Sequence, residues 1–194
     1  MRVIGGIFKG RTIPFVNQKY DNADITSQIV KEALFDILGK RIKGSLFLDL
    51  FSCSGQIGLE ALSRGAASVY MNESDSRRFS FLMKLKKDFE LGDASVFMKY
   101  DAPRCLKKLY TDGVSFDFIY LDPPYVKAKG SAPVYDDIIQ EISSYGILCD
   151  KGEIITQHFS QNLMSEKIGL FSVNDSRKYG LNTLTFYRRD DSLG

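Results

Sequence analysis

The chain has 194 residues, of which 44% are hydrophobic and 26% are charged, and its formal net charge is +2. This composition is ordinary for a globular protein, so we expect one domain with a small extension. No apolar stretch approaches the roughly 20 residues of a membrane span. The N-terminus also lacks the apolar segment of a signal peptide, which predicts a cytoplasmic protein without a membrane partner.

Cysteine and histidine usage argues against a metal site. The three cysteines, Cys53, Cys105 and Cys149, lie far apart and form no pair at metal-ligand spacing. The single histidine, His158, is a poor basis for zinc chemistry, and we expect it to be packed or at the surface. We therefore expect reduced thiols and no bound metal.

The N-terminal segment is basic. Residues 1–16 predict a short hairpin that turns at one of its glycines. The first 19 residues contain Arg2, Lys9, Arg11 and Lys19 but no acidic residue, which suits a segment that lies near phosphates. On charge alone, an ordinary solvated hairpin is an equally good interpretation.

A helix and then alternating strands and helices follow. Apolar residues at helical spacing predict a helix over residues 26–39, with Thr26 as its N-cap. The predicted strands are residues 45–51, 68–73, 95–100, 116–122 and 152–159, and the predicted helices between them are 56–64, 75–90, 102–110 and 134–145. The first four strands are largely apolar on both faces, as in a parallel sheet covered by helices. The tail predicts an antiparallel strand pair that closes one edge, so the fold class is α/β.

The turn after the first strand, in "LDLFSCSGQIGLEAL", has the features of a ligand-binding loop. Gly55 and Gly58 allow the backbone to approach a ligand, and the N-terminus of the following helix supplies unpaired N–H groups. Asp49 lies inside the apolar strand, where a carboxylate needs partners. Either it meets a ligand's ammonium group and loop N–H groups, or it only pins the turn.

Acidic residues follow the next two strands. Glu73 lies 18 residues after Gly55, near the separation at which an acid accepts both ribose hydroxyls of an adenosine. Asp101 follows the third strand and suits both a helix N-cap and a contact to an adenine amine. The chain lacks a phosphate-binding Gly-Lys-Ser or Gly-Lys-Thr loop and a full dinucleotide fingerprint. S-adenosylmethionine, which carries adenosine without phosphate, is the cofactor that fits.

The fourth strand ends in "DPPY", Asp122 to Tyr125. The amine of a nucleobase is a poor nucleophile, and the carboxylate of Asp122 and the carbonyl of Pro123 can accept hydrogen bonds from it. Pro123 and Pro124 fix the backbone, so these acceptors are held rigidly. Tyr125 can stack on a base that has left its helical stack. The motif therefore predicts methylation of a nucleobase amine.

Several motifs together resemble the ribosomal RNA small subunit methyltransferase D family. They cover nearly the whole chain and are "GGIFKGRTI", "VKEALFDIL", "DLFSCSGQIGLEALSRGA", "NESD", "FDFIYLDPPY" and "RKYGLNTLTFY". The resemblance implies a Rossmann-like class I methyltransferase sheet and methyl transfer from S-adenosylmethionine to the exocyclic amine (N2) of a guanine in 16S ribosomal RNA. The cofactor-binding residues it implies are Asp49, Phe51, Ser52, Gly55, Glu73, Asp101 and Ala102. Asp122 to Tyr125 would hold the guanine.

The resemblance also implies an organisation and a partner. We expect residues 1–44 to form an RNA-contacting extension with a hairpin and a helix, in which Arg2, Lys9 and Arg11 bind RNA, and residues 45–194 to form the methyltransferase domain. The expected partner is 16S ribosomal RNA or an assembly intermediate of the small subunit, bound by a monomer.

The chain departs from the family at two places. Cys53 stands where the family usually has glycine, and "DITSQI" replaces a usual Arg-Pro-Thr with a following Asp-Arg pair. Two other functions remain open. They are adenine-N6 methylation of DNA or RNA by the same DPPY chemistry, and RNA binding without catalysis.

Overall fold

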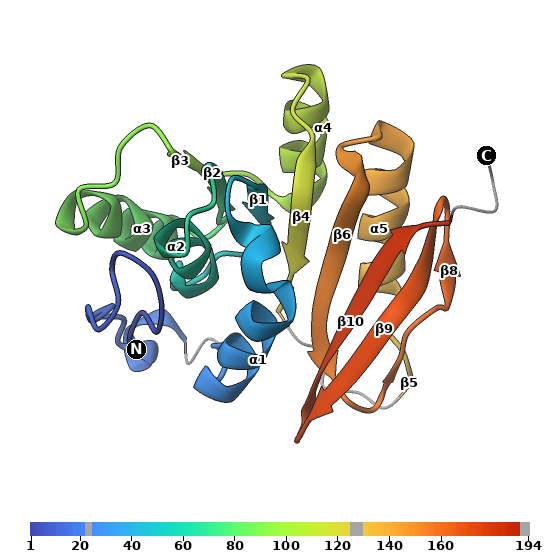
Figure 1. Ribbon diagram of the computed structural model, residues 1–194, viewed down its shortest axis with the longest axis horizontal. Helices are drawn as coiled ribbons and strands as arrows, with labels where there is room; N and C mark the ends of the chain where they lie inside the picture. Colours follow the sequence, from blue (N-terminus) through green and yellow to red (C-terminus); the bar gives the residue numbers. More distant parts are fainter. Residues whose placement is uncertain (22–24, 125–129, 191–194) are drawn as a thin grey trace.

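The computed structural model describes residues 1–21, 25–124 and 130–190. An eight-stranded sheet with the order β3-β2-β1-β4-β6-β10-β9-β8 runs through it (Figure 1). Its strands are β1 (Leu46–Asp49), β2 (Ser68–Asn72), β3 (Ser95–Met98), β4 (Phe116–Leu121), β6 (Leu148–Phe159), β8 (Lys167–Ile168), β9 (Phe171–Tyr179) and β10 (Asn182–Arg189). The neighbours from β3 to β6 are parallel, whereas β10 pairs antiparallel with both β6 and β9. The predicted α/β class and the antiparallel C-terminal pair are confirmed.

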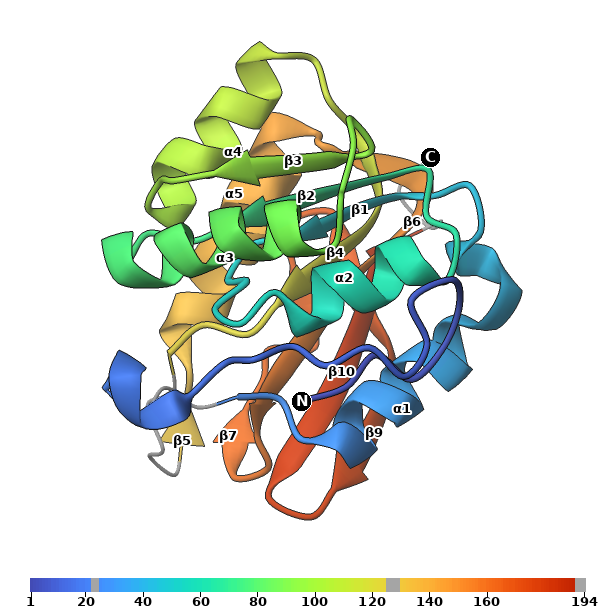
Figure 2. The same cartoon turned by 90° about the vertical axis from the view of Figure 1, so that its left-hand side faces the viewer.

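Helices cover both faces of the sheet. They are α1 (Gln28–Leu38), α2 (Gln56–Ser63) and α3 (Ser76–Asp88) on one face, and α4 (Ala102–Thr111) and α5 (Pro133–Tyr145) on the other (Figure 2). Phe47 packs into the first layer and its neighbour Leu48 into the second, because successive strand residues point to opposite faces. This explains why the central strands are apolar throughout. No helix in the described ranges is long and apolar enough to cross a membrane.

The sequence pattern did not predict several short elements. They are the 3-10 helices η1 (Asn17–Tyr20) and η2 (Gly39–Ile42) and the parallel pair of β5 (Gly130–Ser131) with β7 (Asn162–Leu163). Each spans only two to four residues, too few for a periodic pattern to develop.

The predicted short N-terminal hairpin is observed. Arg2 and Thr12 form an isolated antiparallel bridge, and the N–H of Ile13 donates to the carbonyl of Met1 at 2.9 Å. Val3 adds two further hydrogen bonds between the arms, since its N–H donates to the carbonyl of Arg11 at 3.0 Å and its carbonyl accepts the N–H of Gly10 at 2.8 Å. The segment between the arms also docks on α2, where the buried carboxylate of Glu60 accepts the N–H groups of Ile4 and Gly5 at 2.9 and 2.8 Å.

The first 44 residues share the hydrophobic core of the sheet. Val3 and Ile13 of the N-terminal segment and Leu34 of α1 are buried in the same cluster as Phe47 of β1. The extension therefore has no hydrophobic core of its own in the described structure. Its predicted role in RNA contact depends on its surface residues alone.

Helix α1 begins one residue later than predicted. Ser27, not Thr26, is the N-cap, and its hydroxyl accepts the N–H of Val30 at 3.4 Å. The hydroxyl of Thr26 points elsewhere and donates to Oδ2 of Asp122 at 3.0 Å. The start of α1 is thereby tied to the end of β4.

Candidate active site

A cavity of about 360 Å³ opens where the strand order reverses between β1 and β4. This is the position at which open parallel sheets bind ligands, and the volume lies in the range of small-molecule sites. Its lining comes from loops that follow β1, β2, β3 and β4 and from the segment before α1. The lining residues are Tyr20, Asp21, Leu50, Phe51, Cys53, Asn72, Glu73, Ser74, Arg78, Tyr100, Ala102, Asp122, Pro123 and Pro124.

The turn between β1 and α2 is held in a tight conformation. Gly55 is the N-cap residue of α2 and has φ of 71°, in the left-handed region that favours glycine. Gly58 has a different role from the predicted one, because a Cβ there would lie 2.6 Å from Cγ of Met71. It allows α2 to pack closely on β2 and does not line the cavity. Ser52 ties the turn to β2 through its N–H, which donates to the carbonyl of Asn72 at 2.9 Å.

Cys53 occupies the usual glycine position of this turn with φ of 45°. The turn therefore keeps its left-handed shape without a glycine, at a conformational cost. Burial raises the pKa of the Cys53 thiol to about 12, so the thiol is neutral at physiological pH. Cys53 contributes to the site through its backbone N–H, which donates to Oε2 of Glu73 at 3.1 Å.

Asp49 is the last residue of β1 and is almost fully buried. Its Oδ2 accepts the N–H of Gly58 at 3.1 Å, so it pins the first turn of α2. It also borders a smaller pocket of about 20 Å³ that it shares with Phe51, Ser52 and Asp122. Burial raises the pKa of Asp49 to about 7, an effect that the hydrogen bond from Gly58 opposes. Pinning the turn and facing a ligand pocket are thus compatible roles.

Glu73 lies directly after β2 and lines the cavity. Its Oε1 accepts the N–H of Asp75 at 2.8 Å, and its Oε2 lies 3.2 Å from Nε of Arg78 on α3. Together with the N–H of Cys53, these contacts hold the carboxylate at the cavity wall. The predicted position of this acid at the second strand end is therefore observed.

The third strand end contributes differently from the prediction. Asp101 is the N-cap of α4 and accepts the N–H of Arg104 at 2.9 Å, and it is exposed rather than part of the lining. Its neighbours Tyr100 and Ala102 line the cavity in its place. Asp101 is thus a helix cap, a role that the prediction held compatible with a contact to an adenine amine, and Ala102 lies on the cavity wall.

Asp122 follows β4 at once and borders both pockets. Its Oδ2 accepts hydrogen bonds from Thr26 Oγ1 and from Gln157 Nε2, each at 3.0 Å. Pro123 and Pro124 line the larger cavity beside it. Tyr125 lies outside the described residues, so its predicted stacking role remains a prediction.

The charges around the cavity are predominantly negative. Among the described lining residues, Asp21, Glu73 and Asp122 are acidic and Arg78 is basic, and Asp49 lies in the adjoining pocket. Arg78 is paired with Glu73. Such a site favours a ligand with net positive charge.

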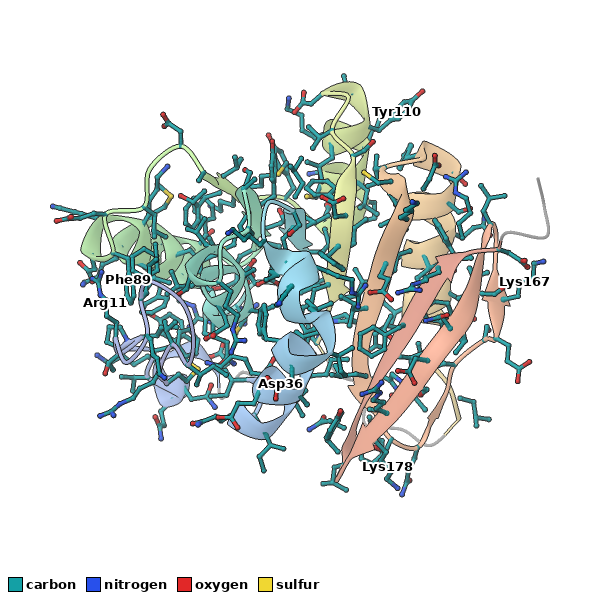
Figure 3. All side chains as sticks on the ribbon, in the orientation of Figure 1. Arg11, Asp36, Phe89, Tyr110, Lys167 and Lys178 are labelled. Carbon is teal, nitrogen blue, oxygen red and sulfur yellow. The ribbon has the colours of Figure 1, made fainter. Side chains whose placement is uncertain are left out.

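The three predicted RNA-binding residues differ in their surroundings. All three residues are exposed. Arg11 contacts the protein itself, with its guanidinium 3.9 Å from the ring centroid of Phe89 and a hydrogen bond of 2.7 Å to the carbonyl of Asp88 (Figure 3). Arg11 therefore helps to dock the N-terminal segment on the end of α3, whatever else it binds.

His158, which we predicted to be packed or at the surface, is packed. It is buried, Nδ1 and Nε2 lie 3.0 Å from the carbonyl of Phe159 and 2.9 Å from Oγ1 of Thr185, and burial lowers its pKa. Cys53, Cys105 and Cys149 are free thiols. In the described part of the chain, His, Cys, Asp and Glu side chains form no cluster that could hold a metal ion.

Sequence reasoning missed several residues of the cavity wall. Tyr20 and Asp21 come from the segment before α1, which carries no local sign of a ligand site. Asn72 had a readable sign, since it is a polar residue in an otherwise apolar strand. Its side chain bridges the loops after β1 and β3, because Nδ2 donates to the carbonyls of Leu50 and Tyr100 at 3.1 and 3.0 Å.

Comparison with known proteins identifies similar chains over the whole length. A family model described as conserved hypothetical protein 95 matches residues 1–188. A Bacillus subtilis protein named as a candidate rRNA methyltransferase, YlbH, is 31% identical over 97% of this chain and 99% of its own length. The Escherichia coli ribosomal RNA small subunit methyltransferase D is 26% identical over 98% of this chain and 90% of its own length. The structure of a candidate methyltransferase from Escherichia coli, yhhF, is similar with a TM-score of 0.81 and 25% identity over 98% of both chains.

Proposed function

Because the chain belongs to the ribosomal RNA small subunit methyltransferase D family, we propose that it transfers a methyl group from S-adenosylmethionine to the exocyclic amine (N2) of a guanine in 16S ribosomal RNA. The observation that carries this proposal is the position of Asp122. It directly follows β4 and lines, together with Glu73, a cavity at the switch point of the sheet.

The residues present fit S-adenosylmethionine. Its sulfonium and ammonium groups suit an acidic cavity, and Glu73 is an acceptor for the ribose hydroxyls. Asp49, Phe51, Ser52 and Gly55 belong to the turn that would hold the amino-acid end. Ala102 lies on the wall for the adenine, with Asp101 as the adjacent helix cap. When bound, S-adenosylmethionine supplies an electrophilic methyl group.

The chain's own contribution to the reaction is to bind and orient the target amine. Asp122 and the carbonyl of Pro123 accept hydrogen bonds from the amine, which localises the nitrogen lone pair for attack. Bound S-adenosylmethionine would supply the methyl carbon for the new bond to nitrogen, and its sulfur would keep the electron pair of the carbon–sulfur bond. The nitrogen then loses one proton, for which the Asp122 carboxylate is an acceptor.

The substrate must present its guanine outside a base-paired stack, because the proposed acceptors, Asp122 and the carbonyl of Pro123, lie beside the cavity just after β4. We propose that Tyr125 stacks on the extruded base and that the exposed Arg2 and Lys9, together with Arg11, contact the RNA backbone. A folded RNA or an assembled subunit should be a better substrate than a short oligonucleotide, since the cavity itself offers little surface for reading sequence.

The product identifies the reaction. The protein is incubated with methyl-labelled S-adenosylmethionine and with unmodified 16S ribosomal RNA, free or in small-subunit particles, and the RNA is digested to nucleosides for mass spectrometry. We expect labelled N2-methylguanosine that is absent from a reaction without protein. Labelled N6-methyladenosine instead would show that the protein methylates adenine and would contradict the proposal. RNA binding without any labelled nucleoside would leave the non-catalytic function.

A further inference from the structure

Thr26 connects three parts of the molecule that are distant in sequence. It is buried, and its hydroxyl donates to Oδ2 of Asp122 at 3.0 Å. Its carbonyl accepts a hydrogen bond of 2.8 Å from Nε2 of Gln56, the first residue of α2. The residue is therefore fixed on its backbone side by the helix that follows the cofactor turn, and its side chain is aimed at the catalytic strand end.

Gln157 approaches the same carboxylate oxygen from β6. It is buried, and its Nε2 donates to Oδ2 of Asp122 at 3.0 Å. Its Oε1 accepts the hydroxyl of Tyr120 at 2.8 Å, and its carbonyl accepts the hydroxyl of Tyr135 at 2.7 Å. An ionised carboxylate only accepts hydrogen bonds, so the amide nitrogen must face Asp122, and the Tyr120 hydroxyl fixes that orientation.

We propose that Thr26 and Gln157 are positioning residues that hold the Asp122 carboxylate in the orientation required to bind the target amine. This inference rests on the proposed methyl transfer. Both residues act through Asp122 and contribute hydrogen bonds from two different elements to one of its oxygens. These two donors restrict the rotation of the Asp122 side chain.

The chemical type of these donors supports this assignment. The carboxylate of Glu73 lines the same cavity as Asp122, and the donors to Asp122 in the described structure include a neutral hydroxyl and a neutral amide. Arg78 is paired with Glu73 and not with Asp122. These two donors each orient the carboxylate without themselves contributing a charge that would weaken it as an acceptor for the amine.

The inference also gives the N-terminal extension a second role. Residues 1–44 were predicted to contact RNA, but Thr26 in this segment reaches into the catalytic end of β4. A shift of about 1 Å in a catalytic group can reduce a rate about 100-fold. A movement of the segment before α1 would therefore change the orientation of the Asp122 carboxylate.

Three variants separate positioning from simple packing. Thr26→Val keeps the shape but removes the hydroxyl, Thr26→Ser keeps the hydroxyl, and Gln157→Leu removes the amide. We expect kcat for methyl transfer to fall about tenfold or more in Thr26→Val and Gln157→Leu, because each loses a hydrogen bond to a charged group. KM for RNA and affinity for S-adenosylmethionine should stay within about twofold, and Thr26→Ser should retain most of the wild-type kcat.

Thr156→Val is the matched control. Its hydroxyl is also buried and donates to a carbonyl, that of Thr185, at 3.3 Å, but it lies one residue from Gln157 on the other face of β6. Its kcat should match the wild type. Equal kcat in Thr26→Val and wild type, or an equal loss in Thr26→Val and Thr26→Ser, would overturn the proposal.

Crystal structures of the same variants test the positioning without any reaction. The Asp122 carboxylate should change its side-chain dihedral angles or adopt two conformers in Thr26→Val, and an unchanged orientation would overturn the inference. If the wild type methylated no RNA, the proposed function would fail while this structural result still decided the positioning. If Gln157→Leu failed to fold, Tyr120→Phe would replace it, since that change removes only the hydroxyl that fixes the Gln157 amide.

Discussion

The backbone N–H of Cys53 donates a hydrogen bond of 3.1 Å to Oε2 of Glu73, which joins the turn after β1 to the end of β2. Glu73 also accepts the N–H of Asp75 and pairs with Arg78. The acid proposed to bind the ribose is thus oriented by the loop that would bind the amino-acid end of the same molecule. The two halves of the cavity wall are therefore expected to respond together to substitution.

Glu73→Gln should weaken S-adenosylmethionine binding while the fold is retained. The amide oxygen can still accept one backbone N–H, but the charge-assisted hydrogen bonds to the ribose are lost, each worth about 1.5–3 kcal/mol. Calorimetry should show an affinity about tenfold or more below the wild type. Glu166→Gln, an exposed change of the same chemistry before β8, is the control and should bind normally. Wild-type affinity in a folded Glu73→Gln would remove the ribose assignment.

Cys53 should show the cost of its left-handed backbone, with φ of 45°. Cys53→Val should lower the free energy of unfolding by at least about 1 kcal/mol, because a β-branched residue is strongly disfavoured in this region. Cys53→Gly should be close to neutral, since relief of strain is offset by the greater freedom of glycine in the unfolded chain.

Urea unfolding measures both changes, and Cys149→Val in β6 is the matched control. Cys149 does not have a positive φ, and valine is well suited to a strand. Equal destabilisation by the two valine substitutions would mean that the backbone at Cys53 is not strained.

Asp49 should make stability depend on pH. Its pKa is about 7 in the folded protein, against an ordinary value of 3.8. Between these values the unfolded carboxyl is ionised and the folded one is protonated, so this group favours unfolding increasingly as pH rises from about 4 to 7, by at most about 1.4 kcal/mol per pH unit. Asp49→Asn cannot ionise, and so should gain stability relative to the wild type over this range.

The measurement is the difference in unfolding free energy between the wild type and Asp49→Asn at pH 5 and pH 8. We expect Asp49→Asn to be more stable relative to the wild type at pH 8 than at pH 5. A difference that is the same at both values would show that Asp49 titrates alike in the folded and unfolded chains.

Lys9 and Arg11 should behave differently, although both were predicted to bind RNA. Lys9→Ala should leave stability unchanged and reduce the slope of log affinity for RNA against log salt concentration by about 1. Arg11→Ala should also lower the free energy of unfolding by about 1 kcal/mol, because Arg11 stacks on Phe89 and bonds to Asp88. If the variant with both Lys9→Ala and Arg11→Ala showed the wild-type dependence of RNA affinity on salt concentration, the segment would be a structural extension only.

Much of the fold followed from the sequence because the central strands are buried on both faces. Apolar runs such as the one that precedes Asp122 predict strands covered on both faces. Because these strands are parallel, the residues that follow them lie at the same edge of the sheet. This reasoning predicted that Asp49, Glu73 and Asp122 lie at one edge of the sheet, where Glu73 and Asp122 line the cavity and Asp49 borders the adjoining smaller pocket. It could not decide what each side chain touches.

The differences arise where a polar side chain had more than one possible partner. Thr26 was expected to cap α1, but Ser27 caps it and Thr26 binds Asp122, 96 residues away. Asp101 was compatible with a cap and with a ligand, and local geometry made it a cap. Tyr20 joined the cavity wall through tertiary packing, which no local pattern records.

The most direct test of the account compares cofactor binding and methyl transfer in Asp122→Asn. The amide keeps the size of the carboxylate but loses its charge, so S-adenosylmethionine affinity and melting temperature should stay close to the wild type. The rate of N2-methylguanosine formation in 16S ribosomal RNA should fall by about 100-fold or more, as expected when one preorganised polar contact to a reacting group is lost. A wild-type rate of methyl transfer in folded Asp122→Asn would contradict the proposed mechanism.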